Sequence, residues 1–394
     1  MNKIKQISTQ LLLALTFVLV CFPALLVVTR GVGFNLPLIL FVSGIGTLIF
    51  HLCTKNKLPM ILSISGLYMG GIITVTQKYD KSFAQGGMII AGIIYLIFAL
   101  LSYKFKDKIL KILPNWLLSI SIVIVGFNLI QIGVGLISKN IIVGIVSVLT
   151  IFIFDLFASK KLSMFSMLFG ILAGTITSII LNHGLDLTPL HQPLHIEFMS
   201  PKFNLESILM LSTISIASIF EMLSDTKNSG SIIGMNIFEE VGIHRVSLGN
   251  GLSTIFSSLI GGTSLTTFSE ANNYMVVCKE YNPNIQILSS FIFMILAFIP
   301  CFSKLILLIP LEAISGCIMY LFCIIVVNGI KQIFESEINL TTDKREFCIM
   351  TVMLAFSFIP FTIFGLSISN VAIAIVVGIT LNLIIPKNHI YTNY

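Results

Sequence analysis

The stretch Gly44–Phe50 reads GIGTLIF, and a similar stretch, GLSTIFS, begins 207 positions later at Gly251–Ser257. Each combines small residues, a threonine and large apolar side chains in the same order. Glycine and serine at such spacings allow two membrane helices to pack closely. The repetition predicts that the chain contains two copies of one unit, residues 1–190 and 191–394.

The order of other features supports this duplication. Leu113-Pro114 opens an apolar run, and Ile309-Pro310 opens another one 196 positions later. A short segment interrupted by glycine, serine or both follows the second apolar run of each half, at residues 59–66 and 261–270. Apolar sequences resemble one another easily, so a single match carries little weight. Their shared order is what indicates a repeat.

The composition requires a membrane. Of the 394 residues, 56% are hydrophobic and 10% are charged, and the mean hydropathy is +1.01. Soluble domains are about 45–50% apolar and about 25% charged. The sequence therefore excludes a soluble globular domain and predicts an all-α polytopic membrane protein that contacts the lipid bilayer along its length.

Apolar runs long enough to approach the length of a membrane span recur along both halves. We expect fourteen spans, near 9–29, 36–53, 59–76, 85–103, 113–137, 141–158, 163–182, 206–226, 246–260, 263–278, 284–302, 305–330, 346–363 and 366–386. Seven spans per half is an odd number, so the second copy enters the membrane from the opposite side. This arrangement is an inverted repeat, in which the substrate site lies at mid-membrane between short, broken segments. The third and tenth spans are those segments.

The distribution of basic residues indicates the orientation. Lys3 and Lys5 precede the first apolar run, which is too long for the core of a signal peptide and is interpreted as the first span. With the N-terminus in the cytoplasm and alternating spans, 17 of the 23 Lys and Arg residues fall in inner connections. This is the positive-inside bias. The formal net charge of +6 therefore reports an inner (cytoplasmic) membrane topology and no nucleic-acid partner.

Three carboxylates lie where the chain is otherwise apolar. Glu221 and Asp225 continue the run Ile208–Phe220, and Glu270 ends the stretch Gly261–Ser269. An ionisable group at membrane depth costs roughly 2.5–3.5 kcal/mol even on the lenient insertion scale. Glu221 and Asp225 are four residues apart and so lie on one helical face. Since burial and mutual repulsion disfavour two charges there, the pair is a candidate for binding a proton.

The alternative is that these acids only hold helices together by hydrogen bonds. Polar contacts between membrane helices average about 0.6 kcal/mol, a small gain for three buried acids. Asp155, near Lys160 and Lys161, is interpreted as a solvated charge at a helix end. Glu312 is left open between the interdomain cleft and a loop.

Neither the cysteines nor the histidines predict a disulfide or a metal site. The seven cysteines lie in or beside apolar runs without a CxxC pair, and buried thiols behave as small hydrophobes. His191 and His195, with Glu197 nearby, have a spacing that zinc accepts, but Pro193 between them prevents a regular helical face. A solvated loop is the favoured interpretation, and we expect no cofactor.

Several motifs resemble those of a known family. These are Gly242-Ile243-His244-Arg245, Asn250–Thr254, Thr266–Glu270, and Ile309–Leu311 followed by Ser315-Gly316 and Asn328–Ile330. Together they resemble the nucleobase–ascorbate transporters, in particular the bacterial uracil permeases. The resemblance covers most of the chain and is strongest between residues 218 and 335.

The resemblance implies a core domain near 9–103 and 206–302 and a gate domain near 113–182 and 305–386. It implies transport of a nucleobase coupled to protons, with sodium as the alternative ion, and a homodimer formed through the gate domain. It places Glu221 and Glu270 in contact with the substrate, beside Gly66, Ser65 and Ser269. Tyr68 or Phe268 is a candidate for stacking on the base. Hydroxyls of Ser63, Thr263, Ser264, Thr266 and Thr267 are candidates for the cavity lining.

The sequence also departs from the family pattern. In the signature after the tenth span, Ala271, Asn273 and Cys278 replace asparagine, glycine and threonine. Gly66 stands where uracil permeases carry phenylalanine. Asp225 stands where they carry histidine, whereas xanthine and urate carriers typically have aspartate there. Glu270 points the other way, because purine carriers more often have glutamine.

The function predicted from these observations is import of a nucleobase, uracil before xanthine or uric acid, by proton symport. An anion carrier or a non-transporting relative of the same fold is the alternative, although three carboxylates disfavour an anion site. An intramembrane protease would need paired catalytic aspartates, and neither Asp155 nor Asp225 lies in a Gly-x-Gly-Asp context. The chain is therefore not expected to be an enzyme.

Overall fold

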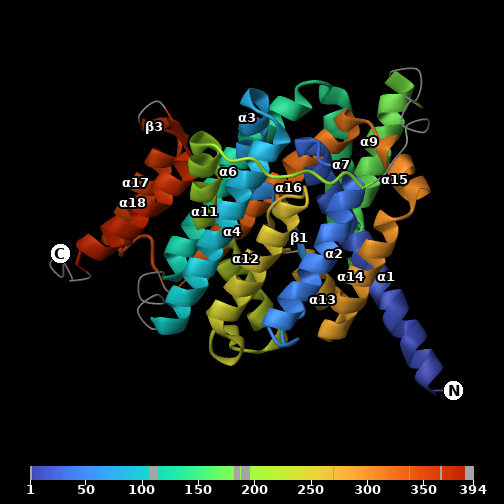
Figure 1. Cartoon of the computed structure of the whole chain (residues 1–394), viewed down its shortest axis with the longest axis horizontal. Helices are drawn as coiled ribbons and strands as arrows, with labels where there is room; N and C mark the ends of the chain where they lie inside the picture. The colour runs from blue at the N-terminus through green and yellow to red at the C-terminus, as the bar shows by residue number, and fades with distance from the viewer. Residues whose placement is uncertain are drawn as a thin grey trace.

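The computed structural model describes residues 2–105, 114–181, 187, 196–268, 270–336, 338–363 and 366–386. Side chains are described for these residues except 2–7, 270, 271, 273 and 362–368. The described chain is a bundle of helices with two short strand pairs (Figure 1). Its interior combines a cluster of aliphatic and aromatic side chains with many buried serine and threonine side chains.

Within the described residues, six helices are long and apolar enough to cross a membrane. They are α1 (Asn2–Val32), of which Ser8–Val32 qualifies, α2 (Leu36–Cys53), α4 (Lys81–Lys104), α6 (Asn115–Ile137), α11 (Leu205–Ile233) and α16 (Leu311–Phe334). Helices α7 (Ile141–Phe157), α9 (Ser166–Leu181) and α18 (Asn370–Ile384) are apolar but shorter. The other α-helices are α3 (Met69–Lys78), α8 (Lys160–Ser163), α12 (Ile243–Leu259), α13 (Glu270–Cys278), α14 (Pro283–Ala297), α15 (Pro300–Leu307) and α17 (Lys344–Ser357), and a π-helix, η2 (Phe238–Gly242), precedes α12. The prediction of a mostly helical polytopic membrane protein is confirmed.

The two short segments that the sequence singled out meet inside the bundle. One runs as strand β1 (Leu62–Ile64), the 3-10 turn η1 (Gly66–Tyr68) and α3, and the other as strand β2 (Leu265–Thr267) and α13. The strands pair antiparallel, with Ser63 opposite Thr266. All six strand residues are buried. Each segment is thus extended where it enters the bundle interior and helical beyond.

Two threonines at equivalent places in the repeat hold this ladder. Ser65 N donates to Ser264 O at 3.1 Å and Phe268 N donates to Ile61 O at 3.1 Å, so the backbone groups of Leu62 and Leu265 point away from the partner strand. Thr47 Oγ1 on α2 accepts from Leu62 N at 3.0 Å, and Thr254 Oγ1 on α12 accepts from Leu265 N at 3.2 Å. Thr254 also donates to Leu265 O at 2.9 Å. The threonines lie 207 positions apart, which is the spacing of the repeated stretch.

The structure differs from the expected spans at two places. Residues 284–302 were expected to form one span, but α14 ends at Ala297 and α15 begins at Pro300 with a bend of 81°. Helix α15 thus covers the end of that span and the start of the next one, 305–330. Proline has no N–H and disfavours the helical conformation of the residue before it, so it begins a new helix.

The two helices found near 346–363 and 366–386 are shorter than the spans predicted there. Helix α17 ends at Ser357, α18 begins at Asn370, and strands β3 (Phe361–Ile363) and β4 (Leu366–Ile368) form an antiparallel hairpin between them. Pro360 stops the helix, and the aromatic and β-branched residues that follow favour extended backbone. Apolar composition alone did not distinguish these strands from helix.

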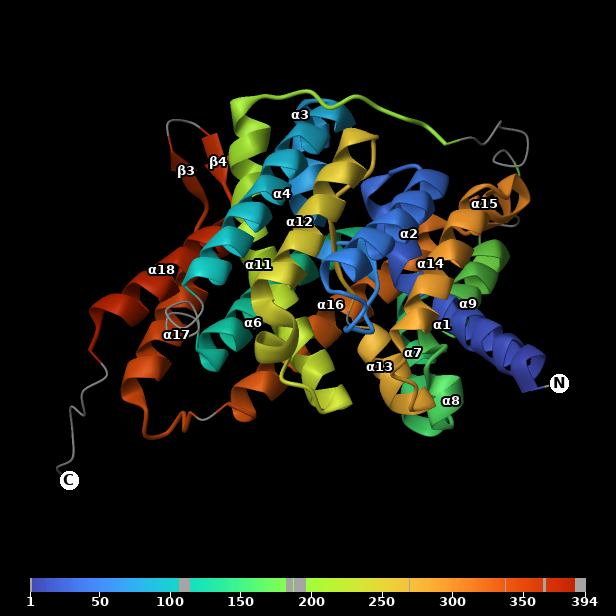
Figure 2. The ribbon, with the colours of Figure 1, turned by 60° about the horizontal axis from the view of Figure 1, so that its bottom comes forward.

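Helices from the two halves pack against each other throughout the bundle. Helix α4 packs on α12 and α11, α2 packs on α14 and α12, and α6 packs on α16. Figure 2 shows the extended segment 196–204 crossing one end of the bundle before α11. There Met199 N donates to Ile260 O at 3.4 Å and Lys202 N donates to Ser82 O at 2.9 Å. The link between the halves is therefore fixed to the ends of α12 and α4.

Glycines at helix crossings allow this close packing and give a testable consequence. A Cβ at Gly251 of α12 would lie 2.9 Å from Gly92 O on α4 and 2.9 Å from Tyr95 Cβ. Because neither atom is the end of a flexible side chain, we expect Gly251→Ala to lower the free energy of unfolding by about 1–3 kcal/mol. The measurement is the thermal unfolding midpoint of purified protein in detergent.

Gly135→Ala in α6 is the matched control. A Cβ there meets no atom within 4 Å, so the substitution should be neutral or slightly stabilising through helix propensity. Equal midpoints for the two variants would contradict the packing argument.

Candidate functional site

Helix α11 brings two of the predicted acids next to the paired strands. Glu221 and Asp225 are both partly buried on its inner part. Thr267 Oγ1, at the end of β2, donates to Asp225 Oδ2 at 3.3 Å. The next residue toward the N-terminus, Ser224, donates to Gln332 Oε1 on α16 at 2.7 Å. Asp225 therefore lies at the end of β2, on a part of α11 that also contacts α16.

Four hydroxyls share one face of the strand pair. Ser63 lies opposite Thr266, and Ser65 lies opposite Ser264, so alternate positions on both strands carry the side chains to the same side. All four hydroxyl oxygens are buried, and none has a hydrogen-bond partner among the described residues. Buried polar groups are nearly always hydrogen-bonded in native proteins. Four buried hydroxyls without partners among the described residues therefore make this face a candidate site for water or a polar ligand.

Two tyrosines extend this site toward Glu221. The hydroxyl of Tyr68 is fully buried, lies close to Ser218 and Ser264, and makes no hydrogen bond within the described residues. Tyr95 on α4 donates to Ser218 Oγ on α11 at 2.8 Å. Both tyrosines are near enough to Glu221 to interact with its charge. Sequence reasoning missed Tyr95 and Ser218, since a single tyrosine or serine in an apolar helix gives no signal.

Gly66 lies where the strand-led segment meets α16. A Cβ at Gly66 would be 3.9 Å from Phe322 Cε1 and 3.9 Å from Val28 Cγ2, which is ordinary van der Waals contact. Phe322 is fully buried. An aromatic ring is thus present beside Gly66, and it comes from α16. The sequence did not predict Phe322, because nothing distinguishes it from the other phenylalanines among the 31 in the chain.

Several sequence predictions cannot be compared with the structure. Ser269, His191 and His195 lie outside the described residues, and Glu270 begins α13 with its side chain outside them. Two residues farther on, Asn272 is buried with both amide atoms partnerless within the described part of the chain. The sequence signature had drawn attention to Ala271 and Asn273 instead.

The other polar residues that the sequence singled out have partners outside the hydroxyl face. Thr263 Oγ1 bonds to Met88 Sδ at 3.0 Å. Asp155 is exposed at the end of α7 and accepts from Tyr320 Oη at 2.6 Å. Glu312, in the first turn of α16, interacts with Arg30 at the end of α1. Among the described residues, no group of three or more His, Cys, Asp or Glu is arranged to hold a metal.

Comparison with known proteins identifies the family. A model of the permease family matches residues 8–366. The chain belongs to the permease family. A permease moves its substrate without converting it, so the prediction of a membrane transporter, and not an enzyme, is confirmed.

Several relatives of this permease are named uracil permeases. The probable uracil permease of Pasteurella multocida is 28% identical over 397 residues, covering 96% of this chain and 94% of that protein. The uracil permease of Bacillus caldolyticus is 26% identical, with 95% and 91% covered. The predicted resemblance to bacterial uracil permeases is therefore confirmed.

Two solved structures share the fold of the permease. The transmembrane domain of the cyanobacterial bicarbonate transporter BicA has a TM-score of 0.66 at 14% identity, covering 96% of this chain and 97% of that one. The murine anion transporter Slc26a9 in its inward-facing state has a TM-score of 0.69 at 13% identity, covering 95% and 67%. At these identities the likeness shows the fold alone.

Proposed function

We propose that this permease imports a nucleobase, with uracil as the favoured substrate, by proton symport. One observation carries the proposal. The two buried tyrosines lie close to Glu221, and Tyr68 also lies close to Ser264 of the strand pair, where the broken segments of the two halves meet. The full-length similarity to proteins named uracil permeases supports the choice of base.

The arrangement suits the chemistry of a nucleobase. A pyrimidine ring presents N–H donors and C=O acceptors along its edge. A carboxylate accepts from a ring N–H in a charge-assisted hydrogen bond, which is about twice as strong as a neutral one. In the proposed site Glu221 accepts from the ring, while hydroxyls of the Ser63 and Ser264 face donate to its carbonyls. Glu270 and Ser269 are proposed to complete the site from β2 and α13, and Gly66, Ser65 and Tyr68 from β1 and η1.

We further propose the fourteen-span inverted repeat for the whole chain. Thr47 and Thr254 bond the backbone of β1 and β2 in the same way. Gln85 near the start of α4 and Gln286 near the start of α14 are both fully buried, with both amide atoms partnerless in the described structure. Such equivalent features in two halves support the repeat. The break of α14 and the strand-led segments account for spans that are not single long helices.

The pattern of helix packing supports a division into core and gate domains. Spans 1–4 and 8–11, near 9–103 and 206–302, are proposed as the core, and residues near 113–182 and 305–386 as the gate. The hydrogen bond from Ser224 to Gln332 links the two. Alternating access then requires this interface to rearrange around the site. A homodimer through the gate domain, an inner-membrane location and a cytoplasmic N-terminus remain predictions of the sequence.

Proton coupling rests on the two acids of α11. Glu221 and Asp225 are one helical turn apart and partly buried, so the site disfavours two simultaneous charges. Binding a proton together with the base would relieve that repulsion, and release would restore it on the other side.

We expect uptake of radiolabelled uracil by cells expressing the permease to require a proton gradient. A protonophore should abolish accumulation, while replacing sodium with choline should leave it unchanged. Unlabelled 5-fluorouracil and thymine should compete better than xanthine. Accumulation that follows a sodium gradient and ignores the protonophore would refute proton coupling. Competition by xanthine, without competition by the pyrimidines, would reverse the substrate order.

A further inference from the structure

A second cavity lies away from the candidate substrate site, at one end of the bundle. It has a volume of about 360 Å³ and is bordered by the loop after α2, the end of α4, the π-helix Phe238–Gly242 and the start of α12. The loop after α2 contributes Thr54, Lys55 and Lys57, and the start of α12 contributes His244 and Arg245. Neither the acids of α11 nor the strand pair lines this cavity.

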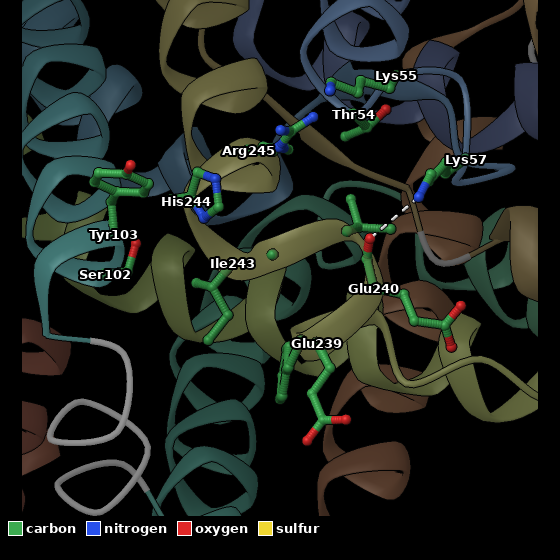
Figure 3. A pocket seen from close by; sticks show the side chains of 13 residues that line it. Thr54, Lys55, Lys57, Ser102, Tyr103, Glu239, Glu240, Ile243, His244 and Arg245 are labelled. Atoms are coloured by element: carbon green, nitrogen blue, oxygen red, sulfur yellow. Dashed lines mark hydrogen bonds between the residues drawn. The ribbon is translucent and has the colours of Figure 1, made fainter.

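Three cationic residues, Lys55, Lys57 and Arg245, and two acids, Glu239 and Glu240, line this cavity. Figure 3 shows Lys55 and Arg245 reaching toward one another from opposite walls. Within the described residues neither forms an ion pair, although Arg245 is partly buried. The carboxylates of Glu239 and Glu240 point to the other side in the same view. Two cations that face each other repel unless an anion lies between them.

The wall formed by the loop after α2 has a fixed backbone. Lys55 and Asn56 adopt left-handed conformations with φ of 56° and 53°, which non-glycine residues adopt at a cost of about 1–3 kcal/mol each. Asn56 Nδ2 donates to Asn284 Oδ1 at 3.0 Å, and Lys57 Nζ donates to Glu240 O at 3.4 Å. These contacts fix the backbone of the loop at Lys55, whose side chain is exposed.

On the opposite wall, two rings in edge-to-face contact lie beside a glycine. The rings of His244 and Tyr103 meet edge to face with centroids 5.1 Å apart. A Cβ at Gly242, where φ is 93°, would lie 2.5 Å from His244 Cε1. Only glycine lets the imidazole lie against the backbone here, and this packing sets the start of α12 from which Arg245 projects.

We propose that this cavity binds a phosphate-bearing anion between Arg245 and Lys55. A guanidinium presents a planar fork of donors that matches phosphate oxygens, and a lysine ammonium adds a point charge. The cavity is larger than a bare phosphate ion, so it accommodates a phosphoester with a small polar substituent. That chemistry is shared by glycerophosphate in solution and by the headgroup of phosphatidylglycerol in the bilayer. Such an anion would tie the loop that leads into β1 to the start of α12.

The test measures binding directly and does not use transport. sn-Glycerol 3-phosphate is titrated by calorimetry into the full-length protein in neutral detergent, at an ionic strength held constant with chloride. In a second arm, the thermal unfolding midpoint is compared in phosphatidylcholine nanodiscs with and without phosphatidylglycerol. Both arms are run on wild type, Arg245→Gln and Lys55→Gln. Lys104→Gln is the matched control, since it removes an exposed positive charge near the end of α4 that does not line the cavity.

We expect Arg245→Gln and Lys55→Gln each to weaken binding at least about tenfold, a loss of one charge-assisted contact, while Lys104→Gln binds like wild type. Calorimetric binding with this pattern assigns the site to a soluble phosphoester. A midpoint increase that appears only with phosphatidylglycerol, and is lost in both cavity variants, assigns it to the lipid headgroup. If neither probe acts, or if Lys104→Gln loses as much as the cavity variants, the proposal is wrong. Lys55→Gln lies on an exposed loop, so it remains informative even if Arg245→Gln folds poorly.

Discussion

Glu221→Gln is expected to reduce uracil uptake by about 100-fold or to below detection. The amide keeps the shape of the carboxylate but loses its charge, and with it about 1.5–3 kcal/mol of a charge-assisted hydrogen bond to the ring N–H. It also removes one of the two acids proposed to bind the proton. Since each 1.4 kcal/mol is a factor of ten, loss of substrate binding and of coupling together exceeds two orders of magnitude. The measurement is the initial rate of labelled uracil uptake, normalised to protein in the membrane.

Glu206→Gln on the same helix is the control for this substitution. Glu206 lies in the first turn of α11, where it pairs with Lys78 at the surface. The lysine of this pair is half exposed, and an amide at position 206 can still accept from Tyr79 Oη, so the change should cost about 0–1 kcal/mol and uptake should stay near the wild-type rate. If Glu221→Gln transports as well as Glu206→Gln does, Glu221 has only a structural role. If both lose uptake while protein levels fall, the loss reflects folding and not chemistry.

The duplicated architecture was accessible from the sequence because it rests on local, repeated cues. The stretch Gly44–Phe50 and its copy at Gly251–Ser257 predicted two related halves. In the structure these residues form the contact between α2 and α12. Ser253 Oγ donates to Gly46 O at 2.8 Å where α2 crosses α12. The small residues allow the crossing, and the threonines beside them hold the strands.

The hydroxyl face was only partly predictable. Ser63, Ser65, Ser264 and Thr266 were candidates because they are polar residues in apolar segments. Their common direction follows from a register between strands that are about 200 positions apart, and no local pattern specifies that pairing. The same limit applies to Tyr95, whose partner Ser218 is 123 positions away. The hairpin of β3 and β4 was missed for a different reason, since apolar runs of that length suit either helix or strand.

The strand pair gives the second large expected effect, through Thr254→Val. Valine has the shape of threonine but no hydroxyl, so the N–H and C=O of Leu265 would lose the partner that they share at 3.2 Å and 2.9 Å. Each buried polar group left without a partner costs about 1–3 kcal/mol. The expected loss is therefore about 2–6 kcal/mol in the free energy of unfolding. Because β2 carries Thr266 and leads to Glu270, uracil uptake should fall with it.

Thr254→Ser separates this hydrogen-bonding role from packing. Serine keeps the hydroxyl and removes one methyl group, so it should retain most of the uptake and most of the stability. Thr47→Val tests the equivalent position, where Oγ1 accepts from Leu62 N at 3.0 Å and lies 2.7 Å from Ser43 O. We expect a similar but smaller loss there, because its contact with Leu62 O is longer, at 3.3 Å. Thermal unfolding in detergent and uptake in cells measure the two effects. If the valine and serine variants of Thr254 behaved alike, the hydroxyl would have no part in holding the strands, and the threonines of the repeat would be packing residues only.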